Sequence, residues 1–361
     1  MSYKIKVKPT ENSRLSTLDF SNIPFGQTFS DHMFVCDYAD GKWANPEIVP
    51  FGNFQLHPAN LAIHYGQSLF EGMKASKMSD GTVALFRADR HAKRLNASAQ
   101  RLCMPEFPED LFVEALETLV DLDSDWIPPA EGSSLYIRPF MYATDQFLGV
   151  RAGNQYKFVI ITGPVGPYYA KPVTLWAEET YIRAAQGGTG EAKSSGNYAG
   201  ALLPTRLANE RGYDQILWLD AVEHKYVQEV GTMNIIFVIN GTVITAPTDG
   251  TILKGITRDA ILTLLRDNGY IVEERPLSMD EIVEAYRAGT LDEVFGCGTA
   301  AVVSHVSELT YRDVKMVLSP VENRKIGNWA KQQIDKMRTG EITDSYGWVQ
   351  PVRVAELVEV N

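Results

Sequence analysis

The pattern of apolar and polar residues predicts short strands and helices that alternate along the chain. The runs IIFVI and TVITA flank an Asn-Gly dipeptide at 240–241, which predicts a β-hairpin. The run QILWLD at 215–220 predicts the strand before it. Residues 258–267 have apolar positions at helical spacing, and Asn-Gly at 268–269 ends the predicted helix. This mixture favours an α+β fold.

The length of 361 residues favours two domains over one. Glycine and proline cluster in GPVGPYYAKP, at 163–172, between two β-rich stretches. We therefore expect a smaller N-terminal domain over residues 1–165, an interdomain loop over 166–181 and a larger domain over 182–361.

Composition and charge exclude several classes of protein. The net charge of −11 disfavours a nucleic-acid binder, although local arginines could still bind a small anion. Apolar runs such as 158–161 are far too short to span a bilayer, and the N-terminus lacks a signal-peptide core. Three widely spaced cysteines favour a reducing compartment, and the six histidines lack metal-ligand spacing. We expect a soluble, cytoplasmic protein without a metal.

The segment QGGTGEAKSSGNYAG, at 186–200, places Lys193 among small residues. Small neighbours allow a planar ligand to approach the backbone, and a lysine amine can form a Schiff base with an aldehyde cofactor. A solvated loop lysine is the alternative.

Glu229 lies in QEVGTMN, at the entrance to the predicted strand IIFVI. A partly buried carboxylate at this position needs a partner, and a protonated ring nitrogen would serve. A salt-bridged surface glutamate is the alternative.

Three further segments could bind an anion. In LKGITRDA, Gly255 precedes a helix start at Ile256 and Thr257, where N–H groups and the helix dipole favour negative charge. The turn in FGCGTAAVV leads to Thr299, and Arg94 in RHAKRLNASAQR could pair with phosphate. The alternatives are a Thr257 N-cap, an ordinary strand-end turn and a solvated helix face.

The segment SLYIRPF predicts a strand that places Tyr136 and Arg138 on one face. An arginine beside a tyrosine suits a carboxylate-binding site. A structural ion pair is the alternative.

Taken in order, the motifs resemble one known family. FGQTFSDHM, LHPAN, SLFEGMKA, SLYIRPF, GPVGPYY, GNYA, EVGTMN, GITRDAI and FGCGTA are similar to the branched-chain amino-acid aminotransferases, which are fold-type IV pyridoxal-phosphate enzymes. The resemblance extends from about Phe25 to TGEITDSYGWVQPV near the C-terminus. It implies a two-domain α+β fold of the D-amino-acid-aminotransferase type, with a smaller N-terminal α/β domain and a larger β-rich domain that binds pyridoxal 5′-phosphate. It also implies a homodimer.

The resemblance also implies roles for the candidate cofactor residues. Lys193 would be the Schiff-base lysine and proton shuttle, Tyr198 would bond the phenolic oxygen of the cofactor, and Glu229 would pair with its pyridine nitrogen. The phosphate would be bound by Arg94, by the N–H groups of Ile256 and Thr257, and by Thr299.

The implied reaction is reversible amino transfer between L-leucine, L-isoleucine or L-valine and 2-oxoglutarate. Arg138 and Tyr65 would bind the distal carboxylate of glutamate, and a mostly apolar pocket with one arginine suits both kinds of substrate. The remaining implied contacts are the aromatic residues Phe25, Tyr65, Tyr136 and Tyr198, Val150 from the neighbouring subunit, and Thr232 with the Ala300 backbone at the α-carboxylate.

Some animal members of this family carry a redox Cys-x-x-Cys pair, at positions that are Ala301 and Ser304 here. We therefore expect no thiol switch, and Cys297 is interpreted as a small buried residue. Three other functions remain open: an aminotransferase for D-amino acids or amines, a lyase similar to the aminodeoxychorismate lyases, and a pyridoxal-phosphate-binding protein without turnover.

Overall fold

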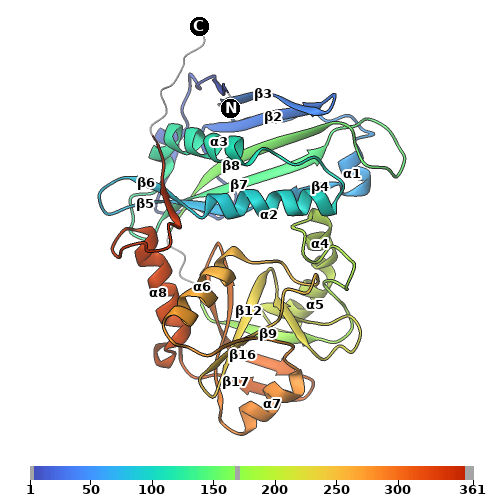
Figure 1. Cartoon of the computed structure of the whole chain (residues 1–361), viewed down its shortest axis with the longest axis vertical. Coiled ribbons are helices and arrows are strands. Elements are labelled where there is room, and N and C mark those ends of the chain that lie inside the picture. Colours follow the sequence, from blue (N-terminus) through green and yellow to red (C-terminus); the bar gives the residue numbers. More distant parts are fainter. Residues whose placement is uncertain (1–3, 167–170, 354–361) are drawn as a thin grey trace. The chain divides into compact units, whose positions relative to one another are not determined.

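The computed structural model describes residues 4–166 and 171–353. The chain separates into two compact units, which we describe individually. Unit 1 comprises Met1–Tyr168 with Asp335–Asn361, and unit 2 comprises Tyr169–Ile334 (Figure 1). Both units combine helices with sheets, as the predicted two-domain α+β fold requires.

Two features differ from the expected domain boundaries. The C-terminal segment groups with unit 1, because β18 (Val349–Pro351) pairs antiparallel with β6 (Val83–Phe86). This makes unit 1 the longer one. Residues expected in the interdomain loop form β9 (Val173–Glu178), which pairs with two strands of unit 2. Both differences arise from strand pairing over long sequence distances, which local composition does not reveal.

The sheet of unit 1 is antiparallel except where β1 pairs with β3. The strand order is β1-β3-β2-β8-β7-β5-β6-β18, and β4 pairs with β7. The strands not yet defined are β1 (Lys6–Val7), β2 (His32–Ala39), β3 (Lys42–Pro50), β4 (Ser68–Phe70), β5 (Met73–Lys77), β7 (Ser134–Ala143) and β8 (Tyr156–Val165). The helices are α1 (Leu61–Tyr65), α2 (Ala88–Arg101) and α3 (Glu109–Leu122), with short 3₁₀ turns at Leu15–Thr17 and Ser124–Trp126.

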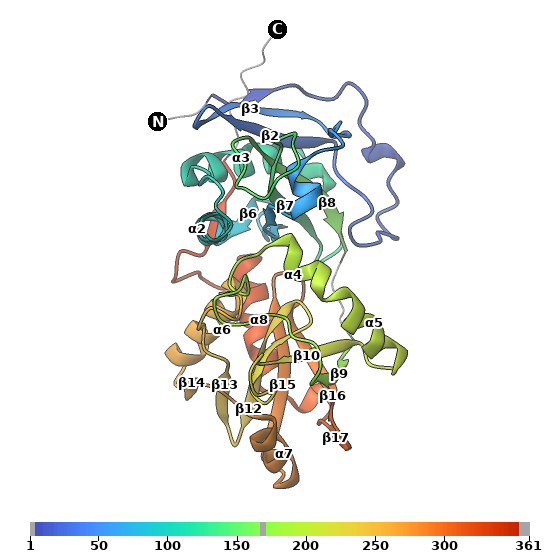
Figure 2. The ribbon, with the colours of Figure 1, turned by 90° about the vertical axis from the view of Figure 1, so that its right-hand side faces the viewer.

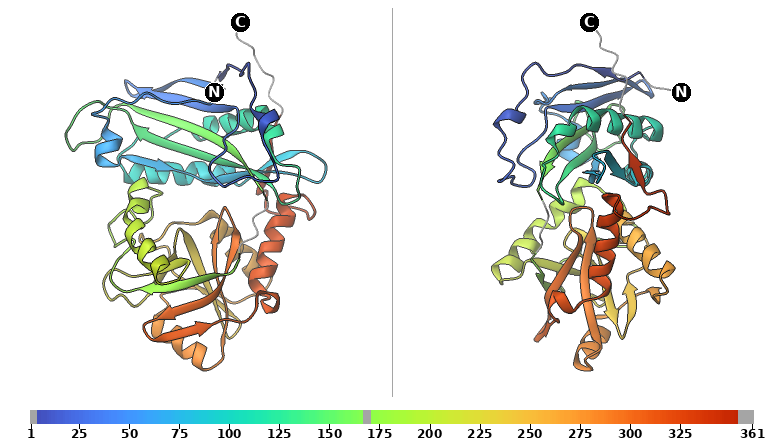
Figure 3. Two further views of the ribbon diagram at one scale, coloured as in Figure 1. Left: turned by 180° about the vertical axis from the view of Figure 1, so that it is seen from behind. Right: turned by 90° about the vertical axis from the view of Figure 1, so that its left-hand side faces the viewer.

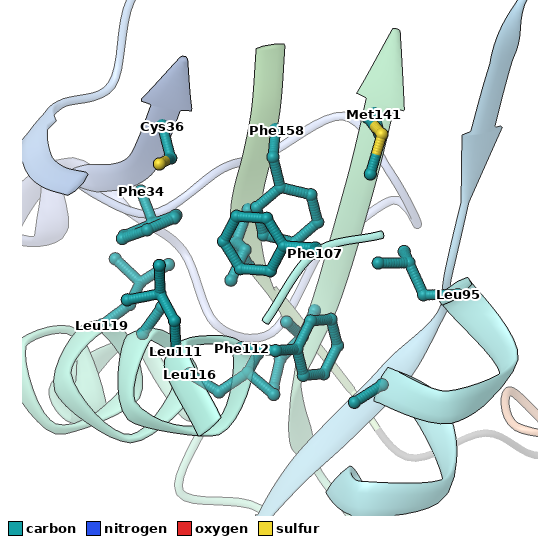
Figure 4. Packing of buried hydrophobic residues seen from close by; sticks show 14 of the residues in the cluster. Phe34, Cys36, Leu95, Phe107, Leu111, Phe112, Leu116, Leu119, Met141 and Phe158 are labelled. Carbon is teal, nitrogen blue, oxygen red and sulfur yellow. The ribbon is translucent and has the colours of Figure 1, made fainter. Parts of the chain in front are cut away.

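The core of unit 1 forms where α2 and α3 pack on this sheet. Leucines and Phe112 recur along α3 at helical spacing and point at the strands (Figure 4). Phe107 and Phe158 stack there with ring centroids 3.9 Å apart. This packing fixes α2, which carries Arg94, against the sheet.

The sheet of unit 2 closes into a barrel. Its pairings run from β11 through β10, β9, β16, β15 and β12 back to β11, and β13, β14 and β17 extend it (Figures 2 and 3). The strands not yet defined are β10 (Gln215–Leu219), β11 (Val227–Val230), β12 (Met233–Ile239), β13 (Thr242–Thr245), β14 (Val272–Glu274), β15 (Leu291–Gly298), β16 (Val302–Tyr311) and β17 (Val314–Val317). The helices are α4 (Ser195–Gly200), α5 (Leu202–Glu210), α6 (Ile256–Asp267), α7 (Met279–Arg287) and most of α8 (Ile326–Arg338), whose residues after Ile334 belong to unit 1. A 3₁₀ turn lies at Val321–Asn323.

The local predictions are confirmed. β12 and β13 form the predicted hairpin, and positive φ angles of 49° at Asn240 and 75° at Gly241 suit its tight turn. The helix predicted over 258–267, with its start at Ile256 and Thr257, runs from Ile256 to Asp267 and ends before Gly269 at φ 80°. No helix in the described ranges, 4–166 and 171–353, has the length and apolar character needed to cross a membrane.

Candidate active site

Several of the predicted site residues lie at one end of the unit 2 barrel. Asn234 on β12 pairs with Cys297 on β15, so the turn that holds Thr232 lies at the same end as the turn that holds Thr299 and Ala300. Glycines leave room for a side chain here: a Cβ at Gly296 or Gly298 would lie 3.0 or 3.3 Å from side-chain atoms of Met233. Sheet topology therefore brings together residues that are far apart in the sequence.

The N-terminus of α6 lies at this end as well. Gly255 is its N-cap, and a Cβ at this position would collide with Asn234 Oδ1. Thr257 is therefore inside the first turn of the helix and is not its N-cap. The first-turn N–H groups of a helix this long point out of its N-terminus and favour an anion.

Glu229 is a buried carboxylate within β11, with 2% of its surface exposed. Oε1 accepts hydrogen bonds from Asn234 Nδ2 at 3.1 Å and from the Leu253 N–H at 2.8 Å. Oε2 forms an ion pair with Arg183 Nε at 2.8 Å. Glu229 is therefore salt-bridged but is not a surface residue. Contacts to both of its carboxylate oxygens fix its orientation.

Lys193 lies just before Ser194, the N-cap of α4, and is half-buried. Its Nζ donates a hydrogen bond to Tyr198 Oη at 2.9 Å. Asn197 holds the preceding loop in place, because its Nδ2 donates to the carbonyls of Thr189 and Ala192 at 2.8 and 2.9 Å. The lysine is thus held in a defined position and is not a solvated loop side chain.

In unit 1, Arg94 is fixed by a carboxylate with no exposed surface. Arg94 Nε and Nη2 bond the two oxygens of Glu71 at 2.8 and 2.7 Å, and His91 Nδ1 lies 2.7 Å from Oε2. Burial by itself would raise the pKa of Glu71, but Arg94 and His91 hold it well below its ordinary value. Arg94 therefore does not belong to a solvated helix face, and its guanidinium has a fixed orientation.

Glu71→Gln should lower the free energy of unfolding by about 3–5 kcal/mol near neutral pH, because it leaves Arg94 buried against a neutral group. The lowered pKa means that this stabilisation is present above the ordinary value of 4.5 and is lost as the pH falls. Denaturant unfolding at several pH values should show the two proteins converging in acid. Glu109→Gln, at an exposed position, should change stability by less than about 0.5 kcal/mol. An equal loss in both variants would contradict the prediction.

Arg138 and Tyr136 share one face of β7, as predicted. Arg138 Nη2 donates to Tyr136 Oη at 2.7 Å, and its guanidinium lies 4.6 Å from the centre of the Phe70 ring. The Phe25 ring contacts Tyr136 edge-on at 5.1 Å. A Cβ at Gly72 would come within 2.5 Å of Tyr136 Oη, so glycine makes room for this tyrosine.

Two other predicted substrate residues lie outside this group. Tyr65 on α1 is 42% exposed, and Val150, between β7 and β8, is 89% exposed. In the described part of unit 1, neither residue forms a hydrogen bond or ring contact with Phe25, Tyr136 or Arg138.

Sequence reasoning missed Arg183, Asn234 and Glu71, which fix the predicted residues in place. Glu71 carried a signal as a charge within the apolar run SLFEGMKA, and Asn234 ends the motif QEVGTMN, whereas Arg183 lies in no motif quoted above. Cys297 is 1% exposed, and burial raises its pKa to about 12, which confirms the interpretation of a small buried residue.

Residues 68–309 match the family model described as amino-transferase class IV. The chain belongs to this family. Pyridoxal phosphate is therefore its cofactor, and the two-domain α+β architecture agrees with the fold of solved members.

Relatives narrow the assignment of this aminotransferase to the branched-chain group, as the motifs predicted. It is 48% identical over 353 residues to a probable branched-chain-amino-acid aminotransferase of Staphylococcus epidermidis, covering 96% of this chain and 98% of the relative. It is 46% identical to branched-chain-amino-acid aminotransferase 2 of Bacillus subtilis, covering 94% of each chain. The crystal structure of the Escherichia coli branched-chain amino acid aminotransferase has a TM-score of 0.72 and 27% identity, covering 90% of this chain and 99% of that one.

Proposed function

We propose that this aminotransferase moves an amino group reversibly between L-leucine, L-isoleucine or L-valine and 2-oxoglutarate, with Lys193 as the lysine that binds the cofactor. The observation that carries the proposal is the contact between Lys193 Nζ and Tyr198 Oη. It gives the amine a fixed position beside a phenol, as a proton-transferring group requires.

The chemistry of the donor set fits pyridoxal phosphate. An amine at Lys193 suits its aldehyde, a phenol at Tyr198 suits its phenolic oxygen, and a buried carboxylate at Glu229 suits a protonated ring nitrogen. The proposed phosphate ligands are the N–H groups of Ile256 and Thr257 at the start of α6, Thr299, and Arg94. Each polar part of the cofactor thus has a partner of suitable charge in the proposed set.

When bound, the cofactor supplies an electron sink for negative charge at the α-carbon of the substrate. Lys193 Nζ takes the proton from that carbon and returns it in the reverse half-reaction. Tyr198 holds the amine in place, and Thr232 with the Ala300 backbone binds the α-carboxylate. Glu229 places a negative charge where a positive ring nitrogen is needed.

Arg138 would allow the pocket to accept glutamate as well as the branched-chain amino acids. We propose that it binds the distal carboxylate of glutamate together with Tyr65, and that Phe25, Tyr65, Tyr136 and Tyr198 line the pocket for branched side chains. The support is that Arg138, Tyr136 and Phe25 form one connected group. A single cation among aromatic rings suits two substrates that differ in charge.

Arg138→Gln should lower kcat/KM for glutamate about 10- to 100-fold more than kcat/KM for leucine, because a charge-assisted hydrogen bond contributes about 1.5–3 kcal/mol. Single-turnover half-reactions with each donor measure both values. Tyr136→Phe, which keeps the ring beside Phe25 but removes the acceptor of the Arg138 bond, should shift selectivity in the same direction. Equal losses for the two donors in Arg138→Gln would reject the assignment.

A spectrophotometric panel of half-reactions tests the function as a whole. L-leucine and L-glutamate should both convert the bound cofactor, with little response to D-alanine or an aromatic amine. Faster conversion by either of the latter would favour an aminotransferase for D-amino acids or amines. Release of more than one equivalent of product per bound cofactor, without a keto-acid acceptor, would identify a lyase. A protein that only binds the cofactor would give no response with any donor.

We also propose a cytoplasmic homodimer in which Val150 reaches the substrate pocket of the neighbouring subunit. Val150 and Leu148, in the segment between β7 and β8, are 89% and 68% exposed, and such apolar surface suits an interface. Cys36, Cys103 and Cys297 are all free thiols, which suits a reducing compartment. Sedimentation velocity tests the dimer, and a monomer with full activity would refute the role of Val150.

A further inference from the structure

The guanidinium group of Arg183 bonds three separate segments of unit 2. The Arg183 side chain is buried, with 9% of its surface exposed. Its Nε pairs with Glu229 Oε2 at 2.8 Å. Its Nη1 donates to the Thr251 carbonyl at 3.0 Å, and its Nη2 donates to the Gly190 carbonyl at 3.2 Å. Gly190 belongs to the loop that leads to Lys193, so the arginine joins the carboxylate to that loop.

Arg183 brings a positive charge to Glu229, which the two donors to Oε1 do not. Asn234 and the Leu253 N–H fix the direction of Oε1, but both are neutral donors. Burial favours the neutral form of a carboxyl group, and a neighbouring cation opposes that effect. A guanidinium suits this position because it stays charged and bonds several acceptors in a rigid plane.

The loop contacts of Arg183 are equally constrained. A Cβ at Gly190 would collide with the Thr251 carbonyl and would lie 2.6 Å from the Ala184 Cβ. The two carbonyls that accept from Arg183 are therefore held close together by tight packing. Thr251 also lies just before Leu253, whose N–H donates to Glu229.

We propose that Arg183 is a positioning residue that keeps Glu229 ionised beside the cofactor's ring nitrogen, and that its bonds to the Gly190 and Thr251 carbonyls hold its guanidinium in place for this role. With Arg183 present, the proton shared by Glu229 and the ring nitrogen stays on the nitrogen. Without the arginine, the buried carboxyl group competes for this proton, and the ring becomes a weaker electron sink. This inference rests on the proposed function of Glu229.

The test uses holoenzyme loaded with pyridoxal phosphate labelled with nitrogen-15 in the ring. Arg183→Gln should move the nitrogen-15 chemical shift toward that of the unprotonated ring and slow the leucine half-reaction about 10- to 100-fold, while KM changes little. Arg183→Lys restores a positive charge and should recover much of the chemical shift. Arg324→Gln is the matched control, because Arg324 is also buried and also bonds a backbone carbonyl, that of Ser319.

A double-variant cycle shows whether Arg183 acts through Glu229. Arg183→Gln should add little to the rate loss in a Glu229→Gln background, since contacting residues are not independent. If Arg183→Gln does not fold, the same cycle is run with Arg183→Lys, whose smaller rate loss should likewise vanish in the Glu229→Gln background.

Two results would overturn the proposal: a wild-type chemical shift in Arg183→Gln, or rate losses that simply multiply in the double variant. Arg183 would then be a structural residue. These results can be told apart from a failure of the proposed function. If that function were wrong, the wild-type protein itself would lack both a lysine-bound cofactor and turnover of leucine.

Discussion

Lys193→Ala should abolish the visible absorption band of the lysine-bound cofactor and lower leucine transamination by more than about 10⁴-fold. The loss is large because one side chain supplies both the covalent attachment and the proton transfer, and proton transfer alone contributes about 10²–10⁴-fold. The 2.9 Å contact with Tyr198 Oη holds this amine in a defined position. Absorption spectra and single-turnover rates of the purified variant measure both effects.

The matched control is Lys225→Ala, which removes a 40% exposed lysine of unit 2 that pairs loosely with Asp280 at 3.8 Å. It should keep the absorption band and the rate of the wild-type protein. If Lys193→Ala retained substantial turnover while Lys225→Ala lost it, the assignment of the cofactor lysine would be wrong.

Glu229→Gln should lower the leucine half-reaction rate, per bound cofactor, by about 10²–10³-fold. Glutamine matches the shape of glutamate but has no charge, so the electrostatic support for a protonated ring nitrogen is lost while packing is kept. Both variants leave Arg183 without its carboxylate partner, but Glu229→Ala would be a poorer probe, because it also opens a cavity in a buried site. Cofactor occupancy, measured after release in alkali, should fall much less than the rate.

Glu293→Gln provides the comparison, since Glu293 is another buried glutamate of unit 2. Its carboxylate accepts from the N–H groups of Ile326 and Gly327 at the start of α8, both at 2.8 Å, away from the Lys193 loop. This variant should lose stability by about 1–3 kcal/mol and keep its rate per bound cofactor. A Glu229→Gln enzyme that turns over as fast as the wild type would remove Glu229 from the mechanism.

Glu229 and Thr257 illustrate how far sequence reasoning reached into the site. The sequence indicated that a carboxylate in QEVGTMN needs a charged partner, but it could not name Arg183, which is far from Glu229 in the chain and belongs to no recognised motif. It left Thr257 open as an N-cap. The structure settles that question, because the helix starts at Ile256 with Gly255 as its N-cap, packed against Asn234.

Features that depend on neighbouring residues could be predicted from the sequence alone. The Asn-Gly turn between β12 and β13 and the end of α6 follow from local backbone preferences, and the ordered motifs identified the family and its cofactor. Tertiary structure alone decided that Arg183 joins Glu229 to the Gly190 loop, that Glu71 orients Arg94, and that the C-terminal β18 pairs with β6. These contacts join segments that have no fixed spacing in the sequence. They are favoured because a buried charge or strand edge needs a partner, and that burial exists only in the folded chain.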